Sequence, residues 1–310
     1  MAPGRGLTAL ALMLAACGVV PEAPPTGPLA LAEAGLEWRE GRLALSHWPA
    51  EGGRPWAVIL GVHGFGFYGE SAFLTAGPFW AARGVEVYAY DQRGFGRNAD
   101  RLDWPGEAGL IGDLEEAARA VKARHPGLPL FVVGHSMGGG VALAAAGEGR
   151  LPEAAGIVAL APAVWGGDTL PLPMRAAAWA AAGLLPEKRW TGAGVVEIRP
   201  TDNLELLRAI VRDPLHVAAP SSREMFGLVR LMDRAVAALP GVRQPALVVV
   251  GAHDEVVPAA PIRQAYEGLG GPKDFVRVAT GWHMLLHDLA AERVHALVTG
   301  WMAEVLRERA

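Results

Sequence analysis

A serine between two glycines has the sequence context of a nucleophile. Residues 134–138 read Gly-His-Ser-Met-Gly, which fits the pattern G-x-S-x-G. This pattern comes directly after a predicted buried strand (130–133) and directly before a helix of small residues, where it forms a sharp strand-to-helix turn. Gly134 and Gly138 leave room for that turn, which holds Ser136 up at the carboxyl end of the sheet. We predict that Ser136 attacks a carbonyl carbon and forms an acyl-enzyme.

A serine hydroxyl attacks well only when a histidine accepts its proton and a carboxylate orients that histidine. Asp254 follows a predicted strand at 246–251, and His283 follows a predicted strand at 274–278. Both side chains are expected just past the carboxyl ends of strands, where an open parallel sheet places its working residues. The order serine, acid, histidine predicts Ser136, Asp254 and His283 as a catalytic triad.

Two ionisable neighbours of the triad offer alternative roles. Glu255 adjoins Asp254, but the apolar residues at 256–258 predict that Glu255 turns outward. His287 lies four residues beyond His283 and could pair with it as a metal ligand. No glutamate follows His283 in the metalloprotease manner, so we expect a structural role for His287 and no metal.

Two further histidines each adjoin a triad residue. His135 precedes Ser136, and His253 precedes Asp254. We expect the geometry of the tight turn to point both imidazole rings away from the triad.

The attacked carbonyl oxygen becomes negatively charged, and each backbone N–H directed at that charge contributes about 3 kcal/mol. Met137, the residue after the nucleophile, supplies one such N–H. The second is expected in the loop after a predicted strand at 56–62. There, residues 63–66 read His-Gly-Phe-Gly and resemble the oxyanion segment of lipases and esterases. Met137 and Phe65 are the predicted oxyanion-hole donors.

Strands and helices alternate along most of the chain. The predicted strands are 56–62, 85–90, 130–133, 156–160, 246–251 and 274–278, and the predicted helices are 110–124, one from 137, 260–268 and 290–307. A hairpin formed by 36–38 and 43–48 is expected at the edge of the sheet. This alternation predicts an α/β fold whose mostly parallel sheet carries helices on both faces.

The alternation stops between residues 162 and 244. Helical patterns such as 174–185 and 225–239, separated by prolines, take its place. We predict a helical cap at 162–244, inserted into a core formed by 34–161 and 245–310. The helix at 174–185 is apolar almost all round, which is typical of a helix that is buried or faces an apolar ligand. Such a cap favours acyl chains over peptides.

Five motifs resemble the monoacylglycerol lipase and lysophospholipase group of α/β-hydrolases. They are 63–66, 91–96 (Asp-Gln-Arg-Gly-Phe-Gly), 134–139, 251–254 and 283–288. The resemblance implies the α/β-hydrolase fold, hydrolysis of a lipid-like ester without a metal or organic cofactor, and a cap that closes over the acyl chain. The family usually has a serine after the 91–96 motif, where this chain has Arg97 and Asn98. We expect that loop to shape the sheet rather than the triad.

The first 17 residues have the layout of an export signal, with Arg5, an apolar stretch at 7–14 and a small-residue ending. Residues 14–17 (Leu-Ala-Ala-Cys) resemble the bacterial lipoprotein box. We therefore predict a signal peptide at 1–17, lipidation of Cys17, a Pro-rich tether at 18–33 and attachment to the membrane of the bacterial cell envelope. A plain secretory signal, giving a periplasmic or secreted protein, is the alternative.

The composition of the chain indicates the class of protein and excludes one class of partner. The 310 residues are 51% hydrophobic and 19% charged, which suits a globular protein. A net charge of −4 without a basic run argues against nucleic acid as a partner.

We predict hydrolysis of a small-molecule acyl ester. One alternative is an aminopeptidase or amidase, whose amine pocket could use acidic residues of the cap, namely Glu187, Glu197, Asp202 and Glu205. Another is a non-catalytic lipid-binding lipoprotein.

Overall fold

The computed structural model describes residues 27–33, 35–38, 41–166, 169–191 and 198–309. Cys17, the predicted signal peptide and most of the predicted tether lie outside these ranges, as does Glu197 of the cap. None of the described helices is long and apolar enough to cross a lipid bilayer.

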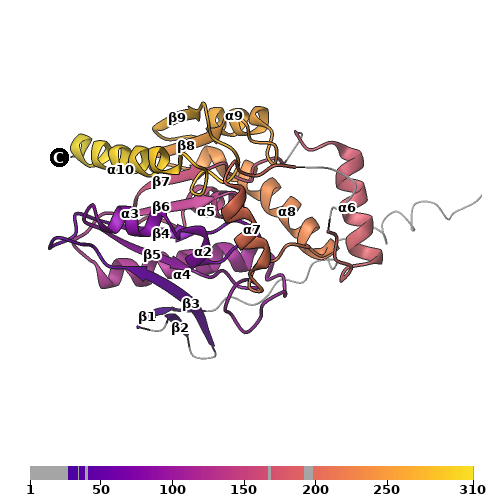
Figure 1. Ribbon diagram of the computed structural model, residues 1–310, viewed down its shortest axis with the longest axis horizontal. Helices are drawn as coiled ribbons and strands as arrows, with labels where there is room; N and C mark the ends of the chain where they lie inside the picture. Colours follow the sequence, from indigo (N-terminus) through magenta and orange to yellow (C-terminus); the bar gives the residue numbers. More distant parts are fainter. Residues whose placement is uncertain (1–26, 34, 39–40, 167–168, 192–197, 310) are drawn as a thin grey trace, which may run out of the picture.

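The strands of the described chain form one sheet in the order β1-β2-β3-β5-β4-β6-β7-β8-β9 (Figure 1). They are β1 (Ala30–Ala32), β2 (Gly35–Trp38), β3 (Gly41–Trp48), β4 (Ala57–Val62), β5 (Val85–Tyr90), β6 (Leu130–His135), β7 (Ala154–Leu160), β8 (Ala246–Gly251) and β9 (Lys273–Val278). In the part of the sheet that runs β5-β4-β6-β7-β8-β9, all neighbouring strands are parallel. Strands β4 to β8 are buried at every residue, as expected for strands covered on both faces. The predicted mostly parallel sheet is confirmed.

The helices of the described chain either cover the two faces of this sheet or belong to the cap. They are α2 (Gly69–Ala72), α3 (Ala76–Ala81), α4 (Gly106–Arg124), α5 (Met137–Gly147), α6 (Leu172–Leu184), α7 (Leu204–Arg212), α8 (Ser222–Ala238), α9 (Ala259–Gly268) and α10 (Ala291–Glu308). Leu114 of α4, Val141 of α5 and Ile262 of α9 belong to one hydrophobic cluster. Trp80 of α3 and Trp301 of α10 belong to the other. The core therefore has two layers with the sheet between them.

The N-terminal edge of the sheet differs from the prediction. Strands β2 and β3 form the expected antiparallel hairpin, but β1 pairs with β2 and lies inside the range predicted as a tether, 18–33. Leu29 is buried, and its N–H lies 3.3 Å from an Oε of Glu116 on α4. The folded core therefore begins before residue 34. A strand of three residues is too short to show the alternation by which strands are recognised in a sequence.

Helices α6, α7 and α8 lie between β7 and β8 in the chain, within the range predicted as a cap. Figure 1 shows α6 standing away from the sheet, on the side opposite the C-terminus. An ion pair between Arg175 and Asp233 (2.6 Å) fastens α6 to α8. Leu172 and Leu184 of α6 are 76% and 80% exposed. This helix packs on α8 by one side and presents apolar side chains to solvent with the other.

Candidate active site

The turn that carries Ser136 is strained and tightly packed. Ser136 has φ 51° and ψ −116°, a conformation that costs a non-glycine residue about 1–3 kcal/mol. Its N–H donates to the carbonyl of Leu160 (2.9 Å), and its own carbonyl accepts from Ala163 (2.8 Å). A Cβ at Gly138 would lie 2.1 Å from the carbonyl oxygen of Val62. Only glycine lets α5 begin this close to the end of β4.

Ser136, His283 and Asp254 form one hydrogen-bonded chain. The Oγ of Ser136 lies 2.9 Å from Nε2 of His283, and Nδ1 of His283 lies 2.9 Å from Oδ2 of Asp254. The side chains of His283 and Asp254 are 7% and 1% exposed. An ionised Asp254 accepts the Nδ1 proton, so Nε2 is free to accept the proton of Ser136. The structure thus brings together the three residues predicted as a triad.

The environment of Asp254 keeps its carboxylate ionised. Burial alone would raise the pKa of Asp254, but the hydrogen bond from His283 and the backbone N–H groups of Val257 and Val256 outweigh burial and lower it. Those two N–H groups donate to Oδ1 at 3.0 and 2.8 Å, which leaves Oδ2 for His283. The carboxylate is therefore fixed in position and in charge.

The competing residues point elsewhere. Glu255 is exposed, and its carboxylate accepts the N–H of Arg199 (2.8 Å). The Nε2 of His287 donates to the carbonyl of Ser71 (2.8 Å), so this ring faces away from His283. His253 is exposed, and its ring lies tilted against that of Trp282 at 5.3 Å between centroids. Among the described residues, no group of three or more His, Cys, Asp or Glu side chains is arranged to hold a metal ion.

The prediction that the ring of His135 points away from the triad is wrong. The ring is buried, and its Nε2–H donates to the backbone carbonyl of His283 (2.9 Å). Burial and the nearby His283 lower the pKa of His135 to about 3, so the ring is neutral and keeps this hydrogen bond across the physiological range. No local pattern in the sequence indicates this contact, because its partners are 148 residues apart in the chain.

The predicted oxyanion donors lie on two segments that pack against each other. In the described chain, the N–H groups of Phe65 and Met137 have no hydrogen-bond acceptor. A Cβ at Gly64 would lie 3.3 Å from Cβ of Ser136, so the loop that carries Phe65 rests directly on the nucleophile turn. Two backbone donors are therefore available beside Ser136.

His63 fixes the shape of this loop. The N–H of Gln92 donates to Nε2 of His63 (2.8 Å), so the ring proton is on Nδ1 and donates to the carbonyl of Gly64 (2.8 Å). Burial lowers the pKa of His63 to about 4, which keeps this tautomer neutral. The ring of Phe65 packs edge-on against Phe95 at 5.2 Å between centroids. The donor residue is held through both its backbone and its side chain.

The 91–98 loop supports the same region. The Nε and Nη2 of Arg97 each lie 2.9 Å from the carboxylate of Asp91, which also accepts the N–H of Gly69. Asn98 donates to the carbonyls of Asp91 and Gln92 and accepts the N–H of Ala44 on β3. These residues tie the loop to the sheet, as expected, and none of these contacts involves the triad.

A segment of the cap rests on the loop that follows Phe65. The N–H of Val217 donates to the carbonyl of Gly66 (2.9 Å), and the ring of His216 lies edge-on to Phe67 at 4.3 Å between centroids. The hydroxyl of Tyr68 donates to Asp213 (2.7 Å). The cap therefore reaches the oxyanion side of the site.

Comparison with known proteins identifies related chains. A family model described as "Serine aminopeptidase, S33" matches residues 53–290. The chain is 29% identical over 269 residues to a monoacylglycerol lipase of Mycolicibacterium smegmatis, covering 81% of this chain and 90% of that one. It is 25% identical over 252 residues to a phospholipase of Bacillus subtilis, covering 79% and 93%. A solved structure of a soluble variant of monoglyceride lipase from Saccharomyces cerevisiae has a TM-score of 0.73 and 18% identity, covering 92% and 99%, a likeness of fold.

Proposed function

Because the chain belongs to the serine aminopeptidase S33 family of α/β-hydrolases, we propose that it cleaves monoacylglycerol-like or lysophospholipid-like esters through an acyl-enzyme on Ser136. The chain is a carboxylic ester hydrolase related to lipases, and its resemblance to the α/β-hydrolases is confirmed. The observation that carries the proposed mechanism is the hydrogen-bonded chain from Ser136 through His283 to Asp254.

The geometry supports a two-step hydrolysis. Oγ of Ser136 attacks the ester carbonyl while Nε2 of His283 takes its proton, and Asp254 stabilises the imidazolium. The N–H groups of Phe65 and Met137 stabilise the oxyanion. His283 then protonates the leaving alcohol, and a water molecule activated by the same ring hydrolyses the acyl-enzyme.

An ester substrate is better supported than a free amino terminus. The carboxylate of Glu187 pairs with Arg223 (2.6 Å), and Asp202 accepts the N–H of Leu289 (2.8 Å). These two acids of the cap are thus already bound elsewhere in the described structure. Apolar side chains of α6 suit a lipid better than a peptide. The complete triad favours turnover over a role in lipid binding alone.

The cellular location is a separate part of the proposal and rests on the sequence alone. We propose that the chain is exported and lipid-anchored through Cys17, so that it meets membrane lipids directly. Intact mass of the protein purified from a bacterial membrane tests this idea. A mature chain that begins at Cys17 and carries acyl groups is expected, and a protein that keeps residue 1 or carries no lipid contradicts the anchor.

Substrate class is tested by rates on three substrates with the full chain and its Ser136→Ala variant. The substrates are monooleoylglycerol, oleoyl lysophosphatidylcholine and an aminoacyl p-nitroanilide. We expect serine-dependent release of oleate from at least one of the first two and no release of nitroaniline. Nitroaniline release without oleate release would replace the proposal with an aminopeptidase.

A further inference from the structure

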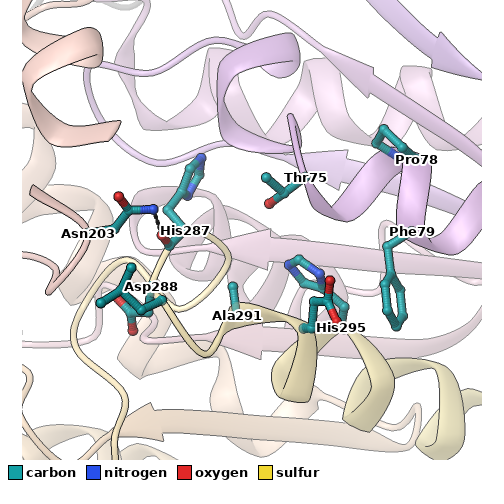
Figure 2. A pocket seen from close by; sticks show the side chains of 10 residues that line it. Thr75, Pro78, Phe79, Asn203, His287, Asp288, Ala291 and His295 are labelled. Atoms are coloured by element: carbon teal, nitrogen blue, oxygen red, sulfur yellow. Dashed lines mark hydrogen bonds between the residues drawn. The ribbon is translucent and has the colours of Figure 1, made fainter. Parts of the chain in front are cut away.

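A short segment of the cap holds the loop that carries His283. We name residues 200–203 the clasp and residues 281–289 the histidine loop. Four hydrogen bonds join them: Met284 N–H to the carbonyl of Pro200 (2.9 Å), Leu289 N–H to Asp202 (2.8 Å), Asn203 Nδ2 to the carbonyl of His287 (2.9 Å) and Thr201 Oγ1 to Asp288 (2.7 Å). Figure 2 shows Asn203 directed at the backbone of His287, with Asp288 beside them.

Asp288 is the side chain through which the clasp reaches the residues next to His283. Its Oδ1 accepts from the hydroxyl of Thr201, and its Oδ2 accepts the N–H of Trp282 at 2.8 Å. Asp288 is 5% exposed and Thr201 is fully buried. One buried carboxylate therefore connects the cap to the peptide unit between Gly281 and Trp282, one residue before the catalytic histidine.

The backbone of His283 is held on both sides. On the N-terminal side, Asp288 fixes the N–H of Trp282, and on the C-terminal side, His135 donates to the carbonyl of His283 (2.9 Å). These two hydrogen bonds restrict the backbone on either side of His283, so rotation of its own side chain is the main freedom left to the imidazole. The bond to Asp254 then determines that rotation, so that Nε2 points at Ser136.

We propose that Asp288 is a positioning residue for His283, and that the clasp, through Thr201, makes the cap part of the machinery that aligns the triad. This inference rests on the proposed function, since it assigns Asp288 a role in the same ester hydrolysis. Asp288 touches neither Ser136 nor the substrate in this mechanism. It acts by keeping Nε2 of His283 within hydrogen-bond distance of Oγ of Ser136.

Burial of the ionised Asp288 carboxylate lowers the stability of the fold. An effect of Asp288 on the position of His283 can therefore be distinguished from an effect on stability. The pKa of Asp288 is raised to about 6: burial is the largest cause and Asp202 adds to it, while the hydrogen bonds from Trp282 and Thr201 and the nearby His283 act in the opposite direction. Asp288 also lines a cavity of about 480 Å³, where its ionisable neighbours are His287, Glu292 and His295. A raised pKa means that the fold favours the neutral form, so the ionised Asp288 lowers stability at neutral pH.

The stability contributed by Asp288 depends on pH because its pKa is raised by folding. The stability that a neutral side chain provides here is present below the ordinary pKa of an aspartate and is lost as the pH rises through about 6. Asp288→Asn, which is neutral throughout, is therefore expected to melt no lower than wild type at pH 7.5. Its kcat is expected to fall about tenfold, because a neutral amide oxygen holds the N–H of Trp282 less strongly than a carboxylate does, and a small misplacement of a catalytic group is costly. If Asp288 had a purely structural role, its replacement would lower the melting temperature and the activity together.

The test uses the variants Thr201→Val and Asp288→Asn, a matched control and one conservative variant. Thr201→Val removes the hydroxyl but keeps the shape of the side chain. Thr299→Val removes a hydroxyl whose partner is the carbonyl of His295 within α10, away from the clasp. Thr201→Ser keeps the hydroxyl and should restore most of the rate. We would measure kcat and KM on p-nitrophenyl butyrate, normalised to active sites titrated with a fluorophosphonate, together with the Nδ1 proton resonance of His283.

We expect Thr201→Val and Asp288→Asn to lower kcat about tenfold with KM within about twofold, and to shift or broaden that resonance. Thr299→Val should match wild type in both readouts. The inference is overturned if both variants match Thr299→Val in kcat and in the resonance, or if the rate falls only in proportion to the loss of folded protein. An inactive wild type would instead contradict the proposed function.

Discussion

Replacing Asp254 by asparagine should stop the reaction by reversing one hydrogen bond. The two backbone N–H groups at Oδ1, from Val256 and Val257, need an acceptor, and each such bond contributes about 1 kcal/mol. The new amide will therefore place its oxygen there and its NH2 group 2.9 Å from Nδ1 of His283, where Oδ2 stands now. Two donors then meet, so the ring proton must move to Nε2. That nitrogen would donate to Ser136 instead of accepting from it.

An imidazole in this tautomer cannot act as the base. We expect kcat at pH 7 to fall about 10⁴-fold, equivalent to about 5.5 kcal/mol of transition-state stabilisation, while KM changes little. Steady-state rates on p-nitrophenyl butyrate measure this. Glu255→Gln is the matched control, because the neighbouring carboxylate is exposed and should leave kcat within about twofold of wild type. A loss below about tenfold for Asp254→Asn, or equal losses for both variants, would refute the assignment of Asp254.

The remaining predictions concern stability, packing and the backbone of the histidine. The pKa of Asp254 is lowered, so its ionised form stabilises the fold above the ordinary pKa of an aspartate, and this stabilisation is lost as the pH falls through the lowered value. The melting temperature of Asp254→Asn should therefore lie below that of wild type at pH 7 and approach it in acid; a gap independent of pH contradicts this. Gly138→Ala should lower the free energy of unfolding in urea by about 3 kcal/mol, because the new Cβ would strike the carbonyl of Val62. The control Gly183→Ala, whose Cβ would meet no atom within 4 Å, should raise the free energy of unfolding slightly. His135→Phe removes the donor to the carbonyl of His283 and should lower kcat about tenfold by the same factor from pH 6 to pH 9, since His135 is already neutral there; a loss that changes with pH would mean that His135 titrates.

The positions of the triad could be predicted because each residue follows a recognisable strand. Parallel strands place their carboxyl ends at one edge of a sheet, so Ser136 after β6, Asp254 after β8 and His283 after β9 had to come close together. Local spacing was sufficient for this part of the site.

The residues that hold the triad in place could not be predicted in the same way. Thr201 and Asp288 are 87 residues apart in the chain, and His135 contacts a carbonyl 148 residues away. The first contact depends on how the cap packs on the core and the second on how the end of β6 meets the histidine loop, and no local pattern encodes either. The role proposed for Asp288 is therefore a result of the structure.

Helix ends were predicted less well than helix positions. Helix α8 begins at Ser222, three residues before the predicted start, because Ser221 and Glu224 form a capping box upstream of the apolar pattern at 225–239. Helices α2 and α3 have four and six residues, and α3 contains Pro78, so neither shows a helical repeat long enough to recognise. These errors lie outside the triad.

Covalent labelling of the nucleophile tests the central claim most directly. The full chain would be mixed with a fluorophosphonate, digested and examined by mass spectrometry, while ester hydrolysis is followed in parallel with wild type and Ser136→Ala. We predict one adduct on Ser136, loss of activity in proportion to labelling, and neither labelling nor hydrolysis in the variant. An adduct on another residue, or hydrolysis by Ser136→Ala at the wild-type rate, would contradict the account.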